Sequence, residues 1–148
     1  MIDAAWSPML AQIWRSYRAL PLWVQLWVGL ILVPANAISF ALLDTWAGRV
    51  AAVAALAVMA TNLPIMWIER GLSRLMAVPH LLIWGPLQVA LLLRWAERVG
   101  PLPLADGERA FLVLLTVVNG ISLLFDALDS WRWFRGERDV PGHCQEIS

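Results

Sequence analysis

The last apolar run of the chain, residues 109–133, carries polar side chains at helical spacing. Asn119, Ser122, Asp126 and Asp129 recur every three or four residues, which places them on one face of a helix. An amide, a hydroxyl and two carboxylates on one face can bind a small solute or ion, or can hydrogen-bond to neighbouring helices. Because polar groups in lipid are costly, we expect this face to point toward the other apolar segments of the chain.

Polar residues also interrupt the other apolar segments, and we expect them to meet this face. The predicted intramembrane polar cluster consists of Asn36, Asn62, His80, Gln88, Asn119, Ser122 and Asp126. Two interpretations stay open. In the first, the amides hydrogen-bond the helices together, at about 0.6 kcal/mol per bond on average. In the second, the cluster lines a small polar cavity in the bundle, which binds or passes a solute.

Asp126 and His80 are the predicted ionisable pair of this cluster. Ionisable groups inside a membrane are functional candidates by default, and His80 is the only histidine in an apolar segment. The alternative is that Asp126 lies at the level of the lipid headgroups, where it pairs with Arg74 or Arg132. Both alternatives are compatible with the sequence.

Composition places the chain among membrane proteins. Its 148 residues are 60% hydrophobic, whereas soluble domains are usually about half apolar. The 11 basic residues, all Arg, balance 11 acidic ones, so the basic patch expected of a nucleic-acid-binding protein is absent. The single cysteine, Cys144, excludes a disulfide within the chain and a cysteine-based metal site.

The charged residues divide the sequence into four apolar stretches, residues 19–43, 50–68, 75–93 and 110–125. A spanning helix needs about 20 apolar residues. We therefore expect an all-α integral membrane bundle of four transmembrane helices, at about residues 22–43, 50–68, 77–95 and 109–130, with residues 44–49 as a polar turn. The fourth stretch is short. Either the bilayer thins locally, or Asp126 lies within the apolar slab and faces protein.

The segments on either side of the bundle have different characters. Residues 1–21 are expected to form an amphipathic helix in the membrane interface, starting near Ser7 and Pro8. Its apolar face would contain Trp6, Leu10, Ile13, Trp14, Tyr17 and Leu20. Residues 136–148 are expected to be a polar, disordered cytoplasmic tail. A signal peptide cleaved after Ala37 is disfavoured, because the apolar run continues to Leu43.

Interface and packing residues complete the predicted bundle. The Trp residues near span ends are expected to anchor it at the membrane interfaces, namely Trp23, Trp27, Trp67, Trp95, Trp131 and Trp133. Pro34, Pro64 and Pro86 are predicted kinks. Residues 51–57 are rich in alanine, and small side chains let helices approach closely. We expect this small face to suit packing against another subunit.

The distribution of Arg predicts the orientation. Seven Arg fall in the N-terminal segment, the 69–74 connector and the tail, against four at the other ends of the spans. Since cytoplasmic segments are enriched in basic residues, both termini are expected in the cytoplasm, with the bundle in the inner or plasma membrane of the cell.

The sequence supports no enzyme class. It contains no nucleophile elbow, no H-E-x-x-H motif and no cluster of histidines for a haem, so we expect a non-enzymatic protein without a cofactor. The first functional hypothesis is an accessory, scaffold or oligomerising subunit, whose partners are lipid and either copies of itself or other membrane subunits. The alternative is a carrier or channel for a small solute or ion, with a small polar or hydrophobic ligand.

Overall fold

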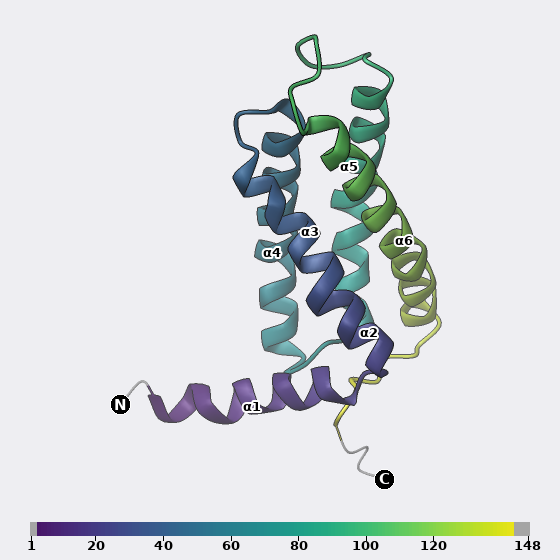
Figure 1. The fold of residues 1–148 in the computed structure, drawn as a ribbon. Helices are drawn as coiled ribbons and strands as arrows, with labels where there is room; N and C mark the ends of the chain where they lie inside the picture. Colours follow the sequence, from purple (N-terminus) through teal and green to yellow (C-terminus); the bar gives the residue numbers. More distant parts are fainter. Residues whose placement is uncertain (1–2, 144–148) are drawn as a thin grey trace.

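The computed structural model describes residues 3–143, in which all regular structure is helical (Figure 1). α1 (Asp3–Ala19) is followed by a first rod made of α2 (Leu22–Leu26), η1 (Trp27–Leu32), α3 (Val33–Ala37) and η2 (Ile38–Ala41). Then come α4 (Trp46–Ile68), η3 (Arg74–Met76), α5 (Ala77–Trp95) and α6 (Glu108–Phe134). The side chains of residues 3–7, and with them Trp6 of the predicted apolar face, lie outside the described part.

Four helical segments are long and apolar enough to cross a membrane. They are Leu22–Ala41, Trp46–Ile68, Arg74–Trp95 and Glu108–Phe134, one for each predicted span. The last of them, α6, has 27 residues, a length of about 40 Å at 1.5 Å per residue. It continues through Asp126 and Asp129, so the charge that ends the apolar run does not end the helix.

The start of α4 differs from the sequence prediction of a polar turn over residues 44–49. The helix begins at Trp46, because the Thr45 hydroxyl caps it by accepting a hydrogen bond from the Gly48 N–H at 3.0 Å. Glycine is required at position 48, since a Cβ atom there would lie 1.9 Å from the Leu42 carbonyl oxygen. The end of the first rod therefore packs directly against the backbone of α4.

The first rod is helical throughout but not a regular α-helix. Residues 27–32 form a π-helical segment, and Pro34, the first of the three predicted kinks, lies two residues after its end. Pro34 has no N–H to donate. In a regular α-helix the Gln25 carbonyl accepts the N–H of Gly29, four residues later, whereas here it accepts the Tyr17 hydroxyl of α1 at 2.7 Å. The π-helical segment therefore lies between a backbone carbonyl that binds α1, that of Gln25, and a residue that lacks the backbone N–H donor, Pro34.

The small-residue face of α4 is used within the chain. Ala47, Ala51, Ala52 and Ala54 are at most 8% exposed and belong to the buried interior of the bundle. The outward face of α4 instead carries Val53, Leu56, Met59 and Leu63, which are about half exposed or more. Ala51, Ala52 and Ala54 of the predicted small face therefore pack within the chain, while Ala55 and Ala57 are partly exposed.

The two ends of the described chain lie at the same end of the bundle. α1 lies across that end, opposite the loop between α5 and α6 (Figure 1). The Leu72 N–H donates to the Ser16 hydroxyl of α1 at 2.9 Å. The start of α1 differs from the prediction of a helix that begins near Ser7 and Pro8. The helix already begins at Asp3 and contains Pro8 within its length. Leu10 and Trp14 of the predicted apolar face are 57% and 61% exposed.

Residues 137–143 of the predicted disordered tail contact this same end of the bundle. Arg74 forms an ion pair with the Glu137 carboxylate at 3.9 Å, and the His143 ring lies 3.2 Å from the Arg70 carbonyl. Gly142 approaches α1 closely, since a Cβ atom there would lie 3.0 Å from the Arg15 carbonyl. Residues 144–148 of the predicted tail lie outside the described residues.

The predicted Trp anchors fall into two groups. Trp23, Trp67, Trp95 and Trp131 are 45–56% exposed on the outside of the bundle, as expected of interface anchors. Trp27 and Trp133 are partly buried. The Trp27 indole N–H points inward and donates to the Ser122 hydroxyl of α6 at 3.1 Å, so Trp27 ties two helices together. Trp133 is covered by the Arg138 guanidinium, 4.7 Å from its ring centroid.

Candidate functional site

Two asparagines join the first rod to α6 by a reciprocal amide contact. Asn36 Nδ2 donates to Asn119 Oδ1 at 2.9 Å, and Asn119 Nδ2 donates back to Asn36 Oδ1 at 3.3 Å. Asn36 is 7% exposed and Asn119 is fully buried. Asn36 Nδ2 also donates to the Leu32 carbonyl at 3.0 Å. We call Asn36 and Asn119 the amide pair. Each amide binds the other, which agrees with the interpretation that the polar face joins the helices by hydrogen bonds.

Two more predicted cluster residues also contact neighbouring helices. Gln88 Nε2 of α5 donates to the Thr116 carbonyl of α6 at 2.9 Å, while its Oε1 is buried without a partner. Ser122 is 5% exposed and accepts the Trp27 N–H described above. Like the amide pair, these contacts link α6 to the helices beside it.

The remaining three predicted residues form a separate group, with His80 at its centre. His80 Nδ1 lies 3.1 Å from Asp126 Oδ1, and His80 Nε2 lies 2.7 Å from Asn62 Nδ2. The Trp84 ring stacks on the His80 ring, with centroids 4.5 Å apart and planes 6° from parallel. We call Asn62, His80, Trp84 and Asp126 the histidine cluster. It joins α4, α5 and α6.

Three of the six buried polar side-chain atoms that have no hydrogen bond among the described residues belong to the histidine cluster. Asn62 Oδ1, Trp84 Nε1 and Asp126 Oδ2 are all inaccessible to solvent and have no hydrogen bond within the described residues. Buried polar atoms are normally paired, so a group of such atoms calls for an explanation. In this part of the chain the packing leaves hydrogen-bonding capacity unused.

Two partners of Asp126 were left open by the sequence, His80 within the bundle and an arginine at the level of the lipid headgroups, and the contacts of Asp126 distinguish them. Asp126 faces protein and contacts His80, and its side chain is 15% exposed. Arg74, the alternative partner, instead pairs with Asp129 at 3.5 Å, where the Asp129 side chain is 45% exposed. The predicted pair of Asp126 with His80 is thus present, and Asp129 lies at the solvated end of the same helix face.

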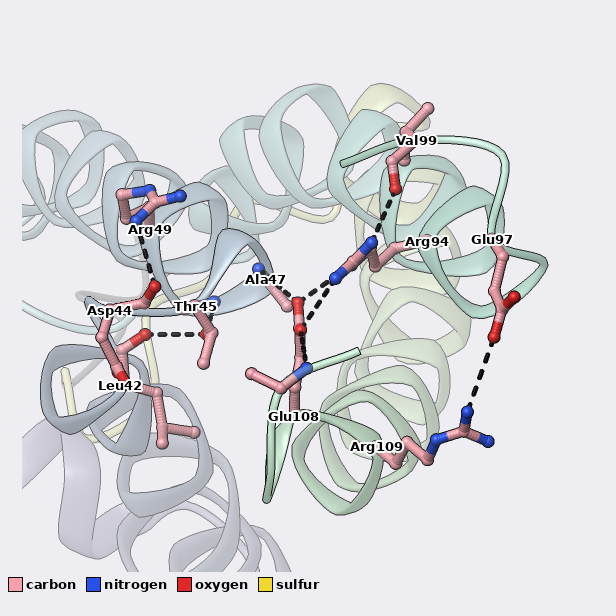
Figure 2. A network of polar contacts seen from close by, with 12 residues as sticks. Leu42, Asp44, Thr45, Ala47, Arg49, Arg94, Glu97, Val99, Glu108 and Arg109 are labelled. Atoms are coloured by element: carbon pink, nitrogen blue, oxygen red, sulfur yellow. Dashed lines mark hydrogen bonds and ion pairs between the residues drawn. The ribbon is translucent and has the colours of Figure 1, made fainter. Parts of the chain in front are cut away.

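A buried ion pair lies at the opposite end of the bundle, where α5 ends and α6 begins (Figure 2). Arg94 Nε donates to Glu108 Oε1 at 3.0 Å, and Arg94 Nη2 donates to Oε2 at 2.9 Å, a bidentate geometry. Both side chains are only 1% exposed. Charges taken out of water are stable only when they are paired and hydrogen-bonded.

Backbone groups complete the hydrogen bonding of this buried ion pair. Glu108 accepts the N–H groups of Ala47 and Ala105, each at 3.1 Å, and Arg94 Nη1 donates to the Val99 carbonyl at 3.0 Å. The pair therefore connects the start of α4, the end of α5, the following loop and the start of α6. Figure 2 shows Ala47 and Arg94 pointing to the Glu108 carboxylate, and Val99 bound to the other side of the Arg94 guanidinium.

Reasoning from the sequence missed this ion pair. Arg94 lies in the last turn of α5 and Glu108 in the first turn of α6, positions at which charged side chains usually reach water. A partial signal was present, because consecutive antiparallel helices bring the end of one to the same end of the bundle as the start of the next, here across the 12-residue loop of residues 96–107. An Arg in the last turn of α5 and a Glu at the start of α6 are placed to meet in this way.

The fold and these contacts define an all-helical bundle with four helices that are long and apolar enough to cross a membrane. Across residues 3–143, no three His, Cys, Asp or Glu side chains gather closely enough to hold a metal ion. Comparison of the chain with protein-family models, curated proteins and solved structures finds no match.

Proposed function

We propose that this chain is an integral membrane protein with four spans that serves as a non-enzymatic accessory, scaffold or oligomerising subunit of a membrane complex. The observation that carries the proposal is the difference between the side chains that face the interior of the bundle, where polar groups are paired, and those that face outward, which are apolar. The two amides of the amide pair bind each other, and so do the two charges of the buried ion pair, so these polar groups are satisfied inside the chain. The outward faces of all four long helices are left apolar.

The outward faces require an apolar environment along the whole bundle. Leu30, Val53, Leu82 and Leu124, one from each long helix, are 68–71% exposed. Monomeric soluble proteins rarely expose apolar surface on this scale. Lipid chains or the helices of other membrane subunits are the surroundings that cover such a surface without an energetic penalty.

The structure bears on the orientation through Arg94. Because Arg94 is buried in its ion pair, it no longer counts as a surface charge. Arg49, Arg98 and Arg109 remain at that end of the bundle, against seven Arg at the end that carries α1. The excess of Arg at the end that carries α1 supports cytoplasmic termini.

Photo-crosslinking in living cells tests the subunit proposal. A photoreactive amino acid is placed at Val53, Leu82 or Leu124, each in turn, and native mass spectrometry of the protein in nanodiscs gives its copy number. We expect a discrete crosslinked protein from at least one of the three faces, and an assembly larger than one chain. The matched control is Leu102, which is 59% exposed but lies in the loop between α5 and α6. A monomer without crosslinks from any face would overturn the proposal.

The second candidate function is a carrier of a small solute or ion, and the histidine cluster favours it. An ionisable pair beside unpaired buried polar atoms is a feature that structural contacts alone do not explain. Uptake into proteoliposomes distinguishes the candidates. A carrier loses uptake in Asp126→Asn while its unfolding free energy changes little, whereas a subunit without transport shows no uptake before or after the substitution.

A further inference from the structure

The hydrogen bonds around His80 define which of its nitrogen atoms carries hydrogen. If Asp126 is ionised, its carboxylate only accepts, and the contact of 3.1 Å between Asp126 Oδ1 and His80 Nδ1 then requires hydrogen on Nδ1. Asn62 Nδ2 is a donor, so His80 Nε2, at 2.7 Å from it, is an acceptor without hydrogen. The three side chains thus hold the neutral imidazole in a single tautomer.

The same three side chains also fit the charged imidazolium. In that form both ring nitrogens donate, so Nε2 can no longer accept from Asn62 Nδ2. If the Asn62 amide turns over, its Oδ1 takes the place of Nδ2 and accepts the new N–H. Asn62 Oδ1 is one of the buried atoms without a partner, in a side chain that is 6% exposed. Protonation therefore gives this oxygen the hydrogen bond that it lacks.

The surroundings of His80 also compensate for the charge. Burial by itself disfavours an imidazolium, whereas a carboxylate in contact and an aromatic face stabilise it. Asp126 supplies the first and Trp84, stacked at 4.5 Å, the second. Beyond them, the nearest charges along α6 and η3 are Asp129 and Arg74, which pair with each other, and Arg74 also pairs with Glu137. Asn62 is the residue of α4 that contacts the ring.

The size of the site selects the bound species. The unpaired atoms of Asn62, Trp84 and Asp126 are each closed to solvent, so the packing offers no room for a solute. A proton needs no cavity. The side chains of His80 and Asp126 are 18% and 15% exposed, so neither is completely enclosed by the described residues.

We propose that the histidine cluster is a proton-binding site, in which His80 takes up one proton, Asp126 is its counter-ion and the Asn62 amide turns over to follow the proton. This inference deepens the carrier candidate by naming its ion, but it does not depend on transport. The site can also bind a proton and release it to the same side of the membrane, in which case no proton is transported.

Nitrogen NMR of histidine-labelled and asparagine-labelled protein in nanodiscs tests the proposal. Imidazole nitrogens report directly which of them carries hydrogen, and histidine ordinarily changes charge between about pH 5 and 8. We expect His80 to have hydrogen on Nδ1 only at high pH and on both nitrogens at low pH. The Asn62 amide signal should change with the same midpoint. A His80 that keeps one form from about pH 5 to 8, or an Asn62 signal that does not follow it, would overturn the proposal.

The second histidine of the chain is an internal control. The His143 ring lies against the exposed Arg70 carbonyl, at the end of the bundle that carries α1. The substitution His143→Gln assigns the two histidine signals. Titration of His143 should leave the Asn62 signal unchanged. A shift of Asn62 with His143 instead of His80 would contradict the site.

Two matched substitutions on α6 test the counter-ion. Asp126→Asn removes the contacting charge, and the proton-binding constant of His80 should fall about tenfold or more. Asp129→Asn removes a charge one turn away that is paired with Arg74, and the constant should change about threefold or less. Equal effects of the two substitutions would show that Asp126 is not the counter-ion.

Proton flux into proteoliposomes then separates the site from the carrier function. Flux that is present in the unmodified protein and lost in Asp126→Asn supports both. A titrating His80 without flux supports the proton-binding site and contradicts a proton carrier. Flux with a His80 that does not titrate overturns the site and leaves the carrier to another pathway.

Discussion

Glu108→Gln is expected to lower the free energy of unfolding by about 3–5 kcal/mol, the largest loss from any single substitution considered for this chain. Gln keeps the shape and the carbonyl oxygen of the side chain but removes its charge. The Arg94 guanidinium, 1% exposed, would then be a buried charge without a counter-ion. Because the Glu108 carboxylate also binds the backbone before α6 and at the start of α4, three of the four long helices depend on it.

Reversible unfolding in bilayers or mild detergent measures this loss, and the chain offers a matched control. Glu97 pairs with Arg109 at 3.5 Å at the same end of the bundle, but the two side chains are 48% and 67% exposed. Glu97→Gln should therefore cost less than about 1 kcal/mol. Adding Arg94→Met to Glu108→Gln should recover part of the loss, since it removes the unpaired charge. Equal losses for Glu97→Gln and Glu108→Gln would contradict this account of the ion pair.

Asn119→Leu is expected to lower the free energy of unfolding by about 1–3 kcal/mol. Leucine is favourable in an apolar interior, but it leaves the Asn36 amide, 7% exposed, with the Leu32 carbonyl as its only partner. The substitution removes the amide contact between Asn36 of the first rod and α6, two elements that are far apart in the sequence. Unfolding in a bilayer measures the effect, as for the ion pair.

A double-mutant cycle shows whether this loss comes from the amide pair. Asn36→Leu combined with Asn119→Leu should cost less than the sum of the two single substitutions, because neither amide is then left without the other. Thr61→Leu is the control, since Thr61 is exposed and its hydroxyl binds only carbonyls of its own helix. It should stay within about 0.5 kcal/mol. Strictly additive losses at Asn36 and Asn119 would show that the two residues do not interact.

The number and place of the long helices could be predicted from the sequence, because charges are excluded from long apolar helices. Every predicted span corresponds to one long helix in the structure. The contact of Asp126 with His80 could also be predicted, since helical spacing puts Asp126 on the polar face of α6 and His80 is the only ring on α5 that can pair with it. These predictions rest on periodicity within one helix and on the scarcity of polar residues.

Contacts that depend on how the helices are placed against one another could not be predicted. The alanines of α4 could pack against a helix of the same chain or against a helix of another subunit. Which of the two occurs depends on the close approach of the first rod at Gly48. Arg94 and Glu108 both occupy positions at which charged residues usually reach water. Only the way in which the loop between α5 and α6 folds back makes them a buried pair.

Labelling of the only cysteine in the sequence, Cys144, tests the central claim most directly, namely that the chain crosses the membrane four times with both ends in the cytoplasm. A maleimide that cannot cross membranes is applied to intact cells and to inside-out vesicles. The account predicts that Cys144 reacts only in inside-out vesicles. Asp106→Cys, in the exposed loop before α6 and with Cys144→Ser, should react only in intact cells. Labelling of both positions from the same side would contradict the four-span arrangement.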